Sequence, residues 1–537
     1  MIARGQCWTC CRREALCDGR KPTCERCEAV KLECMGYGAD GLRGTGDTYR
    51  APNQEIEPPP SGPEQKILPD AIRQSPTTSL YRRAQMIFEG LEYFNKLISP
   101  NIISDASHFN PYIVNLKRLE SFPDHYVKVL VATAGFHRLM TAGPEPTPSS
   151  ALIQRDVDIF GLRSEALGAL NDQLAEPGAQ TSDATLLTVV ALLITSMQSS
   201  VHTEWRAHLE GARHIIHLRG GLKKIIENNQ YFKPILIYFI MADVMGATTC
   251  SSKHKNMPVA TLMALKYWEI EPNVLRLLAA TPNPCPEEIF QSIILINYLR
   301  TIARDERSRK RRRSGTRMVL AKIIRFSPAE YAARMHNFTG WNTSGKDVGF
   351  AKCSPSTDPG SQRSDSSPES ASSAESPKSI SDQDLWFSVA TVYRAASLIY
   401  GLRTLVVDAD DDATLLLPPQ EEGAPANDVA ALREDARKAL TDTLTPVFSD
   451  QDTMYRIGKL VMWPLFILGM EVHHQDTAQR RFFVDGFSML SQTMGVLGPV
   501  GAIDELCHKW ALEAERPQGD QVAWDDYFEG RPDYIVF

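Results

Sequence analysis

The chain has 537 residues, 43% of them hydrophobic and 23% charged, so it can bury a large core and is not disordered throughout. Its formal net charge of −7 argues against non-specific polyanion binding by the protein as a whole, so any contact with nucleic acid has to be local. Seven of the 11 cysteines lie in the first 34 residues, and the scattered remainder is typical of reduced thiols in the cytosol or nucleus.

No membrane or export segment is expected from the sequence. The first five residues, MIARG, contain no apolar run of the kind that a signal peptide needs. The longest apolar stretches, residues 184–197 and 235–247, fall short of the roughly 18 residues that suggest a membrane span.

Six N-terminal cysteines form the array C-x2-C-x6-C-x6-C-x2-C-x6-C, and they are Cys7, Cys10, Cys17, Cys24, Cys27 and Cys34. Thiolates at the C-x2-C spacing reach one metal ion, and these soft ligands favour zinc. Because two tetrahedral ions need eight coordination positions, six thiolates hold two zinc ions only if two of them bridge both metals. The symmetry of the two halves makes Cys7 and Cys24 the expected bridges. Disulfides are the alternative, and nothing in the sequence indicates the secretion that would favour them.

This segment closely resembles the DNA-binding domain of the fungal zinc binuclear cluster (Zn2Cys6) transcription factors. The resemblance rests on CWTCCRR at residues 7–13, CDGRKPTC at residues 17–24, and the last two cysteines. It implies a domain over residues 1–36 that holds two zinc ions and points a short helix into the major groove of double-stranded DNA at GC-rich triplet sites. It also implies a nuclear regulator that acts with RNA polymerase II and the transcription machinery, controlling a metabolic gene set.

The stretch between the second and third cysteines departs from the family pattern. Relatives usually carry several basic residues there, whereas this chain has Cys11, Glu14 and Leu16 at such positions. Residues 1–34 hold seven Lys or Arg against five Asp or Glu, and the six thiolates with two zinc ions cancel that surplus. Since phosphate neutralisation supplies much of protein–DNA affinity, we expect the module to bind weakly by itself.

Four basic residues of the module are the expected DNA contacts. We expect Arg13 to contact a base, because an Arg–guanine pair discriminates between bases. Phosphate contacts, which position the module without reading sequence, are expected from Arg12, Arg20 and Lys21.

The rest of the chain is predicted to be mostly α, a large all-helical regulatory domain behind a Gly- and Pro-rich linker. The linker covers residues 37–79 and shows no sustained heptad pattern, so dimerisation stays open. The helical domain is expected over residues 80–352 and 385–537. Between these parts, residues 353–384 are rich in Ser and Pro, which predicts a disordered insert with phosphorylation candidates.

One helical stretch carries a second resemblance. In residues 203–222, Trp205, Leu209, Ala212 and Ile216 fall on one helix face, and a Gly pair is expected to end the helix. The pattern looks like the signature of the fungal-specific transcription factor domain, the helical regulatory region that follows many of these zinc clusters. That resemblance leaves a small-molecule effector open. The three histidines of the stretch lack the spacing of a zinc-binding helix, so they are expected to be packing or surface residues.

A basic run follows in an otherwise acidic chain. Nuclear import signal and solvated loop are equally open interpretations of this run, which comprises Arg309, Lys310, Arg311, Arg312 and Arg313. Near the C-terminus, Trp524, Tyr527 and Phe528 are expected to pack onto the domain rather than to form an acidic activation segment.

No enzymatic motif is found: the sequence has no G-x-S-x-G, no phosphate-binding G-x-x-x-x-G-K-[ST] and no G-x-G-x-x-G after a strand. A cluster whose positions are all filled by sulfur has no site for an activated water. The leading interpretation is therefore a zinc-dependent, sequence-specific DNA-binding regulator of transcription in the nucleus. Two alternatives stay open. One is a diverged zinc-cluster nuclear protein that binds DNA weakly and acts through protein partners, and the other is a helical ligand-binding or enzymatic domain with a vestigial zinc module.

Overall fold

The computed structural model describes residues 18, 20, 23–29, 76–104, 110–141, 150–199, 204–253, 267, 281–302, 305–337, 382–406, 429–516, 521–531 and 534. The chain divides into two units, Met1–Gln74 and Ser75–Phe537. In the first unit the described part contains one short helix, α2 (Glu25–Ala29). Most of the predicted linker and Ser/Pro-rich insert lies outside the described residues, which begin again in helices at Pro76 and Asp382.

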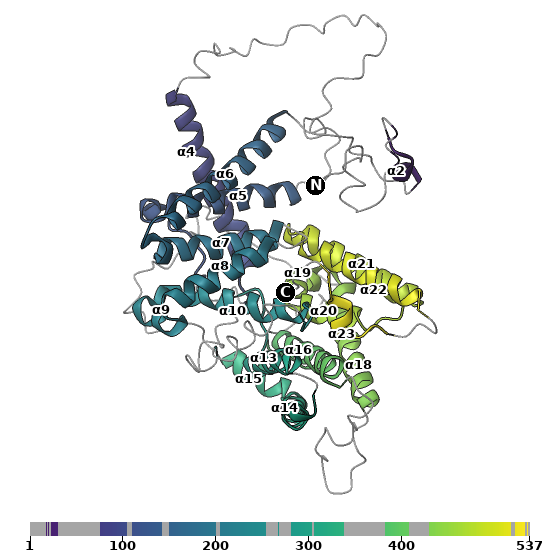
Figure 1. The fold of residues 1–537 in the computed structure, drawn as a ribbon. Coiled ribbons are helices and arrows are strands. Elements are labelled where there is room, and N and C mark those ends of the chain that lie inside the picture. Colours follow the sequence, from purple (N-terminus) through teal and green to yellow (C-terminus); the bar gives the residue numbers. More distant parts are fainter. Residues whose placement is uncertain are drawn as a thin grey trace, which may run out of the picture. The chain divides into compact units, whose positions relative to one another are not determined.

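The described part of the second unit is helical throughout and contains no strand, as the sequence predicts (Figure 1). Its N-terminal half comprises α4 (Pro76–Tyr93), α5 (Asp124–Thr141), α6 (Ser150–Ala175), α7 (Asp183–Ser199), α8 (Glu204–Leu218), α9 (Leu222–Asn228) and α10 (Lys233–Thr248). Short π or 3-10 turns join several of them: η2 (Phe94–Ile98), η3 (Ser99–Asn101), η4 (Leu116–Ser121), η5 (Ala179–Thr181) and η6 (Gln230–Phe232). Here α5 packs against α4, α6 and α7, and α7 packs against α8.

The C-terminal half comprises α13 (Glu287–Thr301), α14 (Glu306–Arg325), α15 (Pro328–Asn337), α16 (Asp382–Leu405), α18 (Val429–Ser449), α19 (Gln451–Ile457), α20 (Met462–Gly469), α21 (Thr477–Met494), α22 (Gly498–Ala514) and α23 (Trp524–Phe528). Its central helix is α16, which contacts α13, α14, α15, α18 and α20. Before α20 the chain makes the 3-10 turn η8 (Gly458–Val461). Pro464 then lies in the first turn of α20, where a missing backbone N–H costs nothing.

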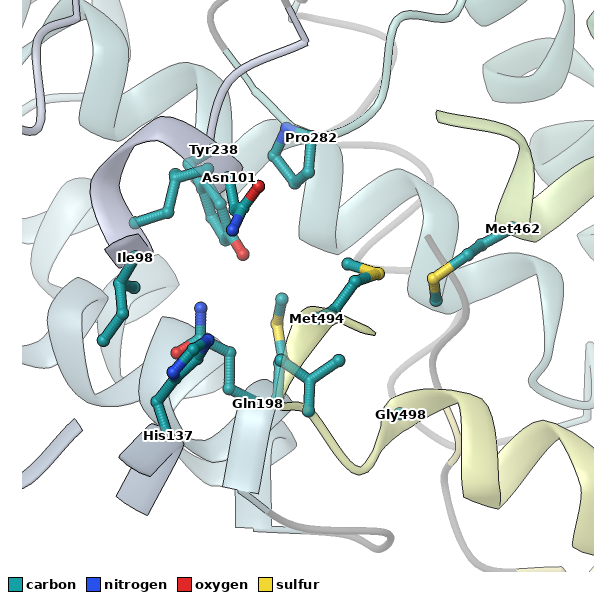
Figure 2. Close-up of a pocket in the computed structure, with 12 residues that line it drawn as sticks. Ile98, Asn101, His137, Gln198, Tyr238, Pro282, Met462, Met494 and Gly498 are labelled. Carbon is teal, nitrogen blue, oxygen red and sulfur yellow. The ribbon is translucent and has the colours of Figure 1, made fainter. Parts of the chain in front are cut away.

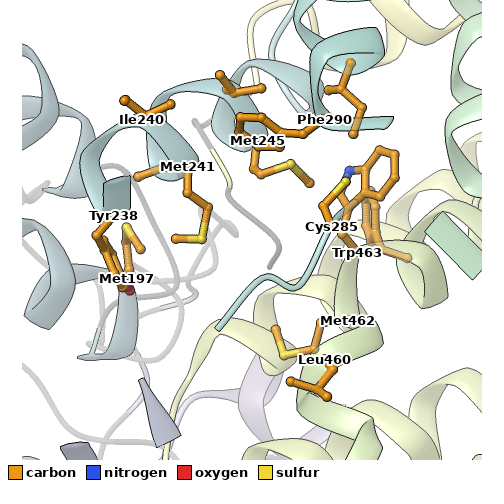
Figure 3. Packing of buried hydrophobic residues seen from close by; sticks show 14 of the residues in the cluster. Met197, Tyr238, Ile240, Met241, Met245, Cys285, Phe290, Leu460, Met462 and Trp463 are labelled. Carbon is orange, nitrogen blue, oxygen red and sulfur yellow. The ribbon is translucent and has the colours of Figure 1, made fainter. Parts of the chain in front are cut away.

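One continuous hydrophobic core joins the two halves (Figure 3). Helix α10 is apolar on all sides, and every residue from Leu236 to Thr248 is buried, as expected for a helix surrounded by others. Figure 3 shows Met245 of α10 near Phe290 of α13 and Trp463 of α20, and Met241 of α10 toward Tyr238 and Met197. Distant parts of the sequence therefore share this core.

Two helical segments have the length and mean hydropathy of a membrane span, Gln230–Thr248 and Asp384–Leu405. The first contains the apolar stretch of residues 235–247, which by itself is shorter than a membrane span. In these segments 83% and 72% of the apolar window is buried inside the protein, and the core helices of a folded domain have the same composition. Their burial accounts for their hydropathy.

The interpretation of the basic run as a solvated loop is wrong, because Arg309, Lys310, Arg311, Arg312 and Arg313 lie in α14. The Asp305 side chain caps this helix by accepting a hydrogen bond from Ser308 N at 2.8 Å. Further along, Thr316, Val319, Leu320 and Ile323 are buried. This apolar face, one helical turn beyond the charges, is what makes the segment fold as a helix.

Candidate functional site

In the first unit, the structure describes the segment that carries two of the six predicted zinc ligands. Cys24 is fully buried, and its carbonyl accepts the Glu28 N–H at 3.1 Å, so it occupies the N-cap of α2. Cys27 follows three residues later in the chain, within α2. This C-x2-C spacing is the one at which two thiolates bind a shared metal.

The other predicted ligands and most predicted DNA contacts lie outside the described residues; these are Cys7, Cys10, Cys17, Cys34, Arg12, Arg13 and Lys21. Within the described parts of the chain, no three His, Cys, Asp or Glu side chains cluster as metal ligands. The sixfold array therefore stays a prediction.

Arg20, a predicted phosphate contact, is described and is held by acidic neighbours. Its backbone N–H donates to Asp18 Oδ2 at 3.3 Å. Its guanidinium lies 3.2 Å from Glu25 Oε1 and 3.9 Å from Glu28 Oε2, both in the first turn of α2. The Arg20 side chain is still 57% exposed, so the pairing is a weak surface interaction that a phosphate can displace. These carboxylates nevertheless lower the positive potential at the predicted contact.

In the second unit, the resemblance stretch forms α8 as predicted. Trp205, Leu209, Ala212 and Ile216 are all buried on one face. The helix ends at a Gly pair: Gly220 and Gly221 have φ of +85° and +93°, and Gly221 N–H donates to Ile216 O at 2.9 Å. Both glycines adopt backbone angles that other residues rarely tolerate. His214 and His217 point to solvent, consistent with their expected surface role.

A buried ion pair fixes α8 against α10, and the sequence contained no signal for it. Arg213, 5% exposed, donates to Asp243 Oδ1 of α10 and to Glu210 Oε2 at 2.5 Å. Tyr267 OH donates to the other Asp243 oxygen at 2.5 Å. Burial is the largest single influence and opposes the charge on Arg213, but Asp243, Glu210 and Tyr267 together outweigh burial and raise the pKa of Arg213. Because Tyr267 and Arg213 are 24 and 30 residues from Asp243, no local pattern connects them.

A small pocket lies where both halves of the second unit meet (Figure 2). It offers about 60 Å³ of free volume. Apolar side chains dominate the lining, including Met197, Met462 and Met494 from three different helices, and polar groups come from Asn101, His137, Gln198 and Tyr238. Pockets for drug-sized ligands have about 300–1,000 Å³, so this one holds a few atoms or waters unless its flexible methionines move.

Two titratable groups border the pocket. Tyr93 OH is 2.9 Å from His137 Nδ1, whereas His137 Nε2 is buried and makes no hydrogen bond of ordinary geometry. Burial lowers the pKa of His137, and the nearby Met494 carbonyl acts in the opposite direction. Lys459 reaches the carbonyls of Pro100 and Ile103 at 3.4 Å and the lining residue Asn101 at 3.3 Å. Burial lowers the pKa of Lys459 to about 8.

The helical domain can be compared with known families. Residues 89–537 match the family model described as the fungal specific transcription factor domain. The chain belongs to this family. The fungal transcription factor domain is thus most of the protein, and the resemblance seen around α8 is confirmed. Its family is one of transcription regulators and not of enzymes.

Two curated relatives are similar to this fungal transcription factor domain protein. One is the phomenoic acid biosynthesis cluster-specific transcriptional regulator of Leptosphaeria maculans, 23% identical over 521 residues, covering 94% of this chain and 85% of the relative. Another, the pestheic acid cluster transcriptional regulator 3 of Pestalotiopsis fici, is 47% identical over 36 residues, or 7% of this chain and 6% of the relative. No solved structure matches. These comparisons establish transcription regulation as the function class.

Proposed function

We propose that this protein is a zinc-dependent, sequence-specific DNA-binding regulator that works with RNA polymerase II in the nucleus. The main support for the proposal is that residues 89–537 belong to a family of transcription regulators. In such a regulator, the N-terminal cysteine array would serve as the DNA-binding segment. The described pair Cys24 and Cys27 supports it, since the two residues lie one helical turn apart. Both relatives are named as cluster transcriptional regulators, one of them of a biosynthesis cluster, so the proposed targets are the genes of a biosynthetic gene cluster.

In the proposed mechanism zinc has a structural role. The six cysteines hold two ions, which supply folding energy to a segment too short for its own core. The module then places Arg13 against a guanine, while Arg12, Arg20 and Lys21 contact phosphates. For Arg20 this requires release from Glu25, the nearer of its two carboxylates.

The alternative function is a nuclear protein that binds DNA weakly and acts through protein partners. The carboxylates beside Arg20 favour it, because they offset one of the few positive charges of the module. Glu14 in the first half of the cysteine array acts in the same direction.

Selection on randomised duplexes across a salt series separates the two functions. The proteins to compare are wild type, Arg13→Ala, and the double variant Glu14→Lys/Leu16→Lys. We expect wild type to select a GC-rich site, Arg13→Ala to relax that selection by about 1–3 kcal/mol, and the double variant to bind more tightly with a steeper salt slope. If wild type selects no sequence while the double variant does, direct recognition has been lost and the partner-binding function stands.

The pocket supports a second, narrower proposal, a small-molecule effector of the helical domain. Asn101, His137, Gln198 and Tyr238 supply hydrogen-bonding groups in an otherwise apolar lining. An effector there would be small and amphipathic, or would widen the pocket by displacing methionines. Replacing Met462 with Trp should fill the pocket. If an effector binds there, a reporter gene that responds to this effector in wild type should lose the response in the variant and keep its basal expression.

A further inference from the structure

Helix α14 is the most strongly charged element among the described residues. Its 20 residues contain nine Lys or Arg and a single Glu, in a chain whose net charge is −7. The remainder of the chain is therefore more acidic than the total suggests. Figure 1 shows α14 at the lower end of the helical unit, beside α13 and α15.

The fold determines which of these bases face solvent. Six of the bases are exposed: Arg307, Arg309, Lys310, Arg311, Arg317 and Arg325. At 3.6 residues per turn, Arg307, Lys310, Arg311 and Arg317 share one face of the helix. The opposite face is held in place by its buried apolar residues, through contacts with α13 and α16. Arg311 is further oriented by Tyr298 of α13, since its guanidinium lies 5.7 Å from the ring centroid and donates to the hydroxyl.

This arrangement is unfavourable for the helix itself. Arg307 lies in its first turn, where the partial positive charge of the helix N-terminus repels cations. Like charges three or four residues apart, such as Arg307 with Lys310 and Arg311, cost about 0.2–0.5 kcal/mol each. An anionic partner would remove this repulsion.

We propose that the exposed face formed by Arg307, Lys310, Arg311 and Arg317, here called the α14 basic face, binds the phosphate backbone of double-stranded DNA. Arginine suits phosphate because its planar guanidinium donates two parallel hydrogen bonds. Ser314 is exposed between the bases, and Ser hydroxyls are common phosphate donors. The contact goes beyond the proposed function, because it reads no sequence and needs no zinc.

Two other occupants fit the face less well. A protein interface needs large apolar or aromatic anchors, and the exposed apolar residue of α14 is Met318, beyond the bases. The groove next to Met318 also contains Glu288 and Glu330, so the basic character belongs to the N-terminal half of the helix. An import receptor that takes up an extended peptide would need α14 to unfold, although residues Thr316 to Ile323 anchor it in the core.

Because both DNA contacts lie on one chain, binding through α14 raises the effective concentration of the module at DNA. It would offset the weak electrostatics expected of residues 1–34. A protein of net charge −7 would then bind DNA through two local contacts, of which the α14 basic face carries most of the positive charge.

The test compares two triple variants of the full-length chain with wild type. Arg307→Gln/Lys310→Gln/Arg317→Gln removes three charges from the α14 basic face, and glutamine preserves helix propensity. The matched control removes three exposed charges elsewhere, by glutamine at Lys117, Lys223 and Arg481. Affinity for a 30-base-pair duplex of random sequence is measured by fluorescence anisotropy between about 50 and 200 mM salt.

We expect the slope of log K against log salt to fall by roughly two to three in the α14 variant, at about 0.9 per phosphate contact, and to stay at the wild-type value in the control. Substituting lysine for Arg307 and Arg317 should preserve the slope, because the charge is kept. Equal slopes for the α14 variant and the control overturn the proposal, as does a wild type that does not bind the random duplex.

Repeating the series in a Cys27→Ser background separates this proposal from the proposed function. There we expect sequence selection to disappear while the difference between α14 variant and control persists. If that difference disappears together with selection, the α14 basic face is not an independent site and the proposal fails. Nuclear accumulation of fluorescent fusions is measured in parallel. If the α14 variant stays in the cytoplasm while its salt slope equals that of wild type, the basic run is an import signal. That result overturns DNA binding by α14.

Discussion

The guanidinium of Arg300 donates to the Asp525 carboxylate at 2.6 Å, although the two residues are 225 positions apart. Arg300 also donates to Cys250 O at 2.6 Å and to Tyr400 OH at 2.5 Å, so one buried cation joins α13, α16, the end of α10 and α23. Around this pair, Trp524 Nε1–H donates to Thr248 O at 2.8 Å. The C-terminal segment is therefore an integral part of the core, and its predicted packing is confirmed.

We expect Asp525→Ala to destabilise the helical unit by about 3 kcal/mol, because it leaves the fully buried Arg300 without its counter-charge. Asp526→Ala is the matched control, since Asp526 is 62% exposed and its loss should cost less than about 1 kcal/mol. Denaturant midpoints of the two variants, measured at neutral pH, give the comparison. Equal midpoints would contradict the role of the pair.

The same pair predicts a dependence on acid. Burial is the largest single influence and opposes ionisation of Asp525, but the charge and hydrogen bond of Arg300, with the hydrogen bonds from Ser252, together outweigh burial and lower the pKa of Asp525. A lowered carboxyl pKa gives stability that is present above the unfolded-state value of about 3.9 and is lost as pH falls through the folded-state value. The difference in midpoint between wild type and Asp525→Ala should therefore shrink below about pH 4. If the difference in midpoint stays constant as the pH falls below 4, the ionised Asp525 carboxylate does not supply the stability.

Lys459 predicts a dependence on pH at the alkaline side. Burial lowers its pKa from 10.5 to about 8. Between pH 8 and 10.5 the folded state therefore binds fewer protons than the unfolded chain. Below pH 8 both states are protonated and the folded state carries the full penalty, roughly 3 kcal/mol. Stability of wild type relative to Lys459→Met should thus rise from pH 8 to 10. Lys438→Met, at an exposed position of α18, controls for the loss of one charge. A flat difference between wild type and Lys459→Met would disprove this effect.

Gly495 ends α21 with φ of +62°, and an added Cβ would meet the His137 ring and the Thr141 methyl at 2.8 Å. Gly178 has φ of +88°, but a Cβ there meets nothing within 4 Å. We expect Gly178→Ala to cost about 1 kcal/mol from backbone strain alone, and Gly495→Ala to cost about 1–3 kcal/mol more because it overpacks the pocket wall. Thermal unfolding of both variants measures the difference. Similar losses would mean that the contact with His137 relaxes freely.

The zinc prediction is tested by metal analysis of the full-length chain. Wild type should contain two zinc ions, and Cys11→Ser should retain both, because Cys11 stands outside the symmetric array. Cys24→Ser should lose most of the metal, since a bridging thiolate serves both ions. One zinc per wild-type chain, or metal loss in Cys11→Ser, would refute the binuclear arrangement.

The sequence by itself determined the features that depend on local pattern. An apolar face at helical spacing followed by a Gly pair is a property of neighbouring residues, so α8 and its end at Gly220 and Gly221 were predictable. The C-x2-C spacing of Cys24 and Cys27 belongs to the same class of information, because one helical turn separates them.

Only the tertiary structure decided how the charged residues are used. In the sequence, the bases of α14 are a single run; in the fold, its apolar face turns Arg312 inward, 8% exposed, and Arg307 and Lys310 outward. The partners of Arg213 and Arg300 come from other helices, and a buried charge is stable only where such partners converge. Local periodicity carries no record of distant partners. Helix packing therefore determines which charged side chains are buried with partners in the core and which are exposed and able to bind phosphate.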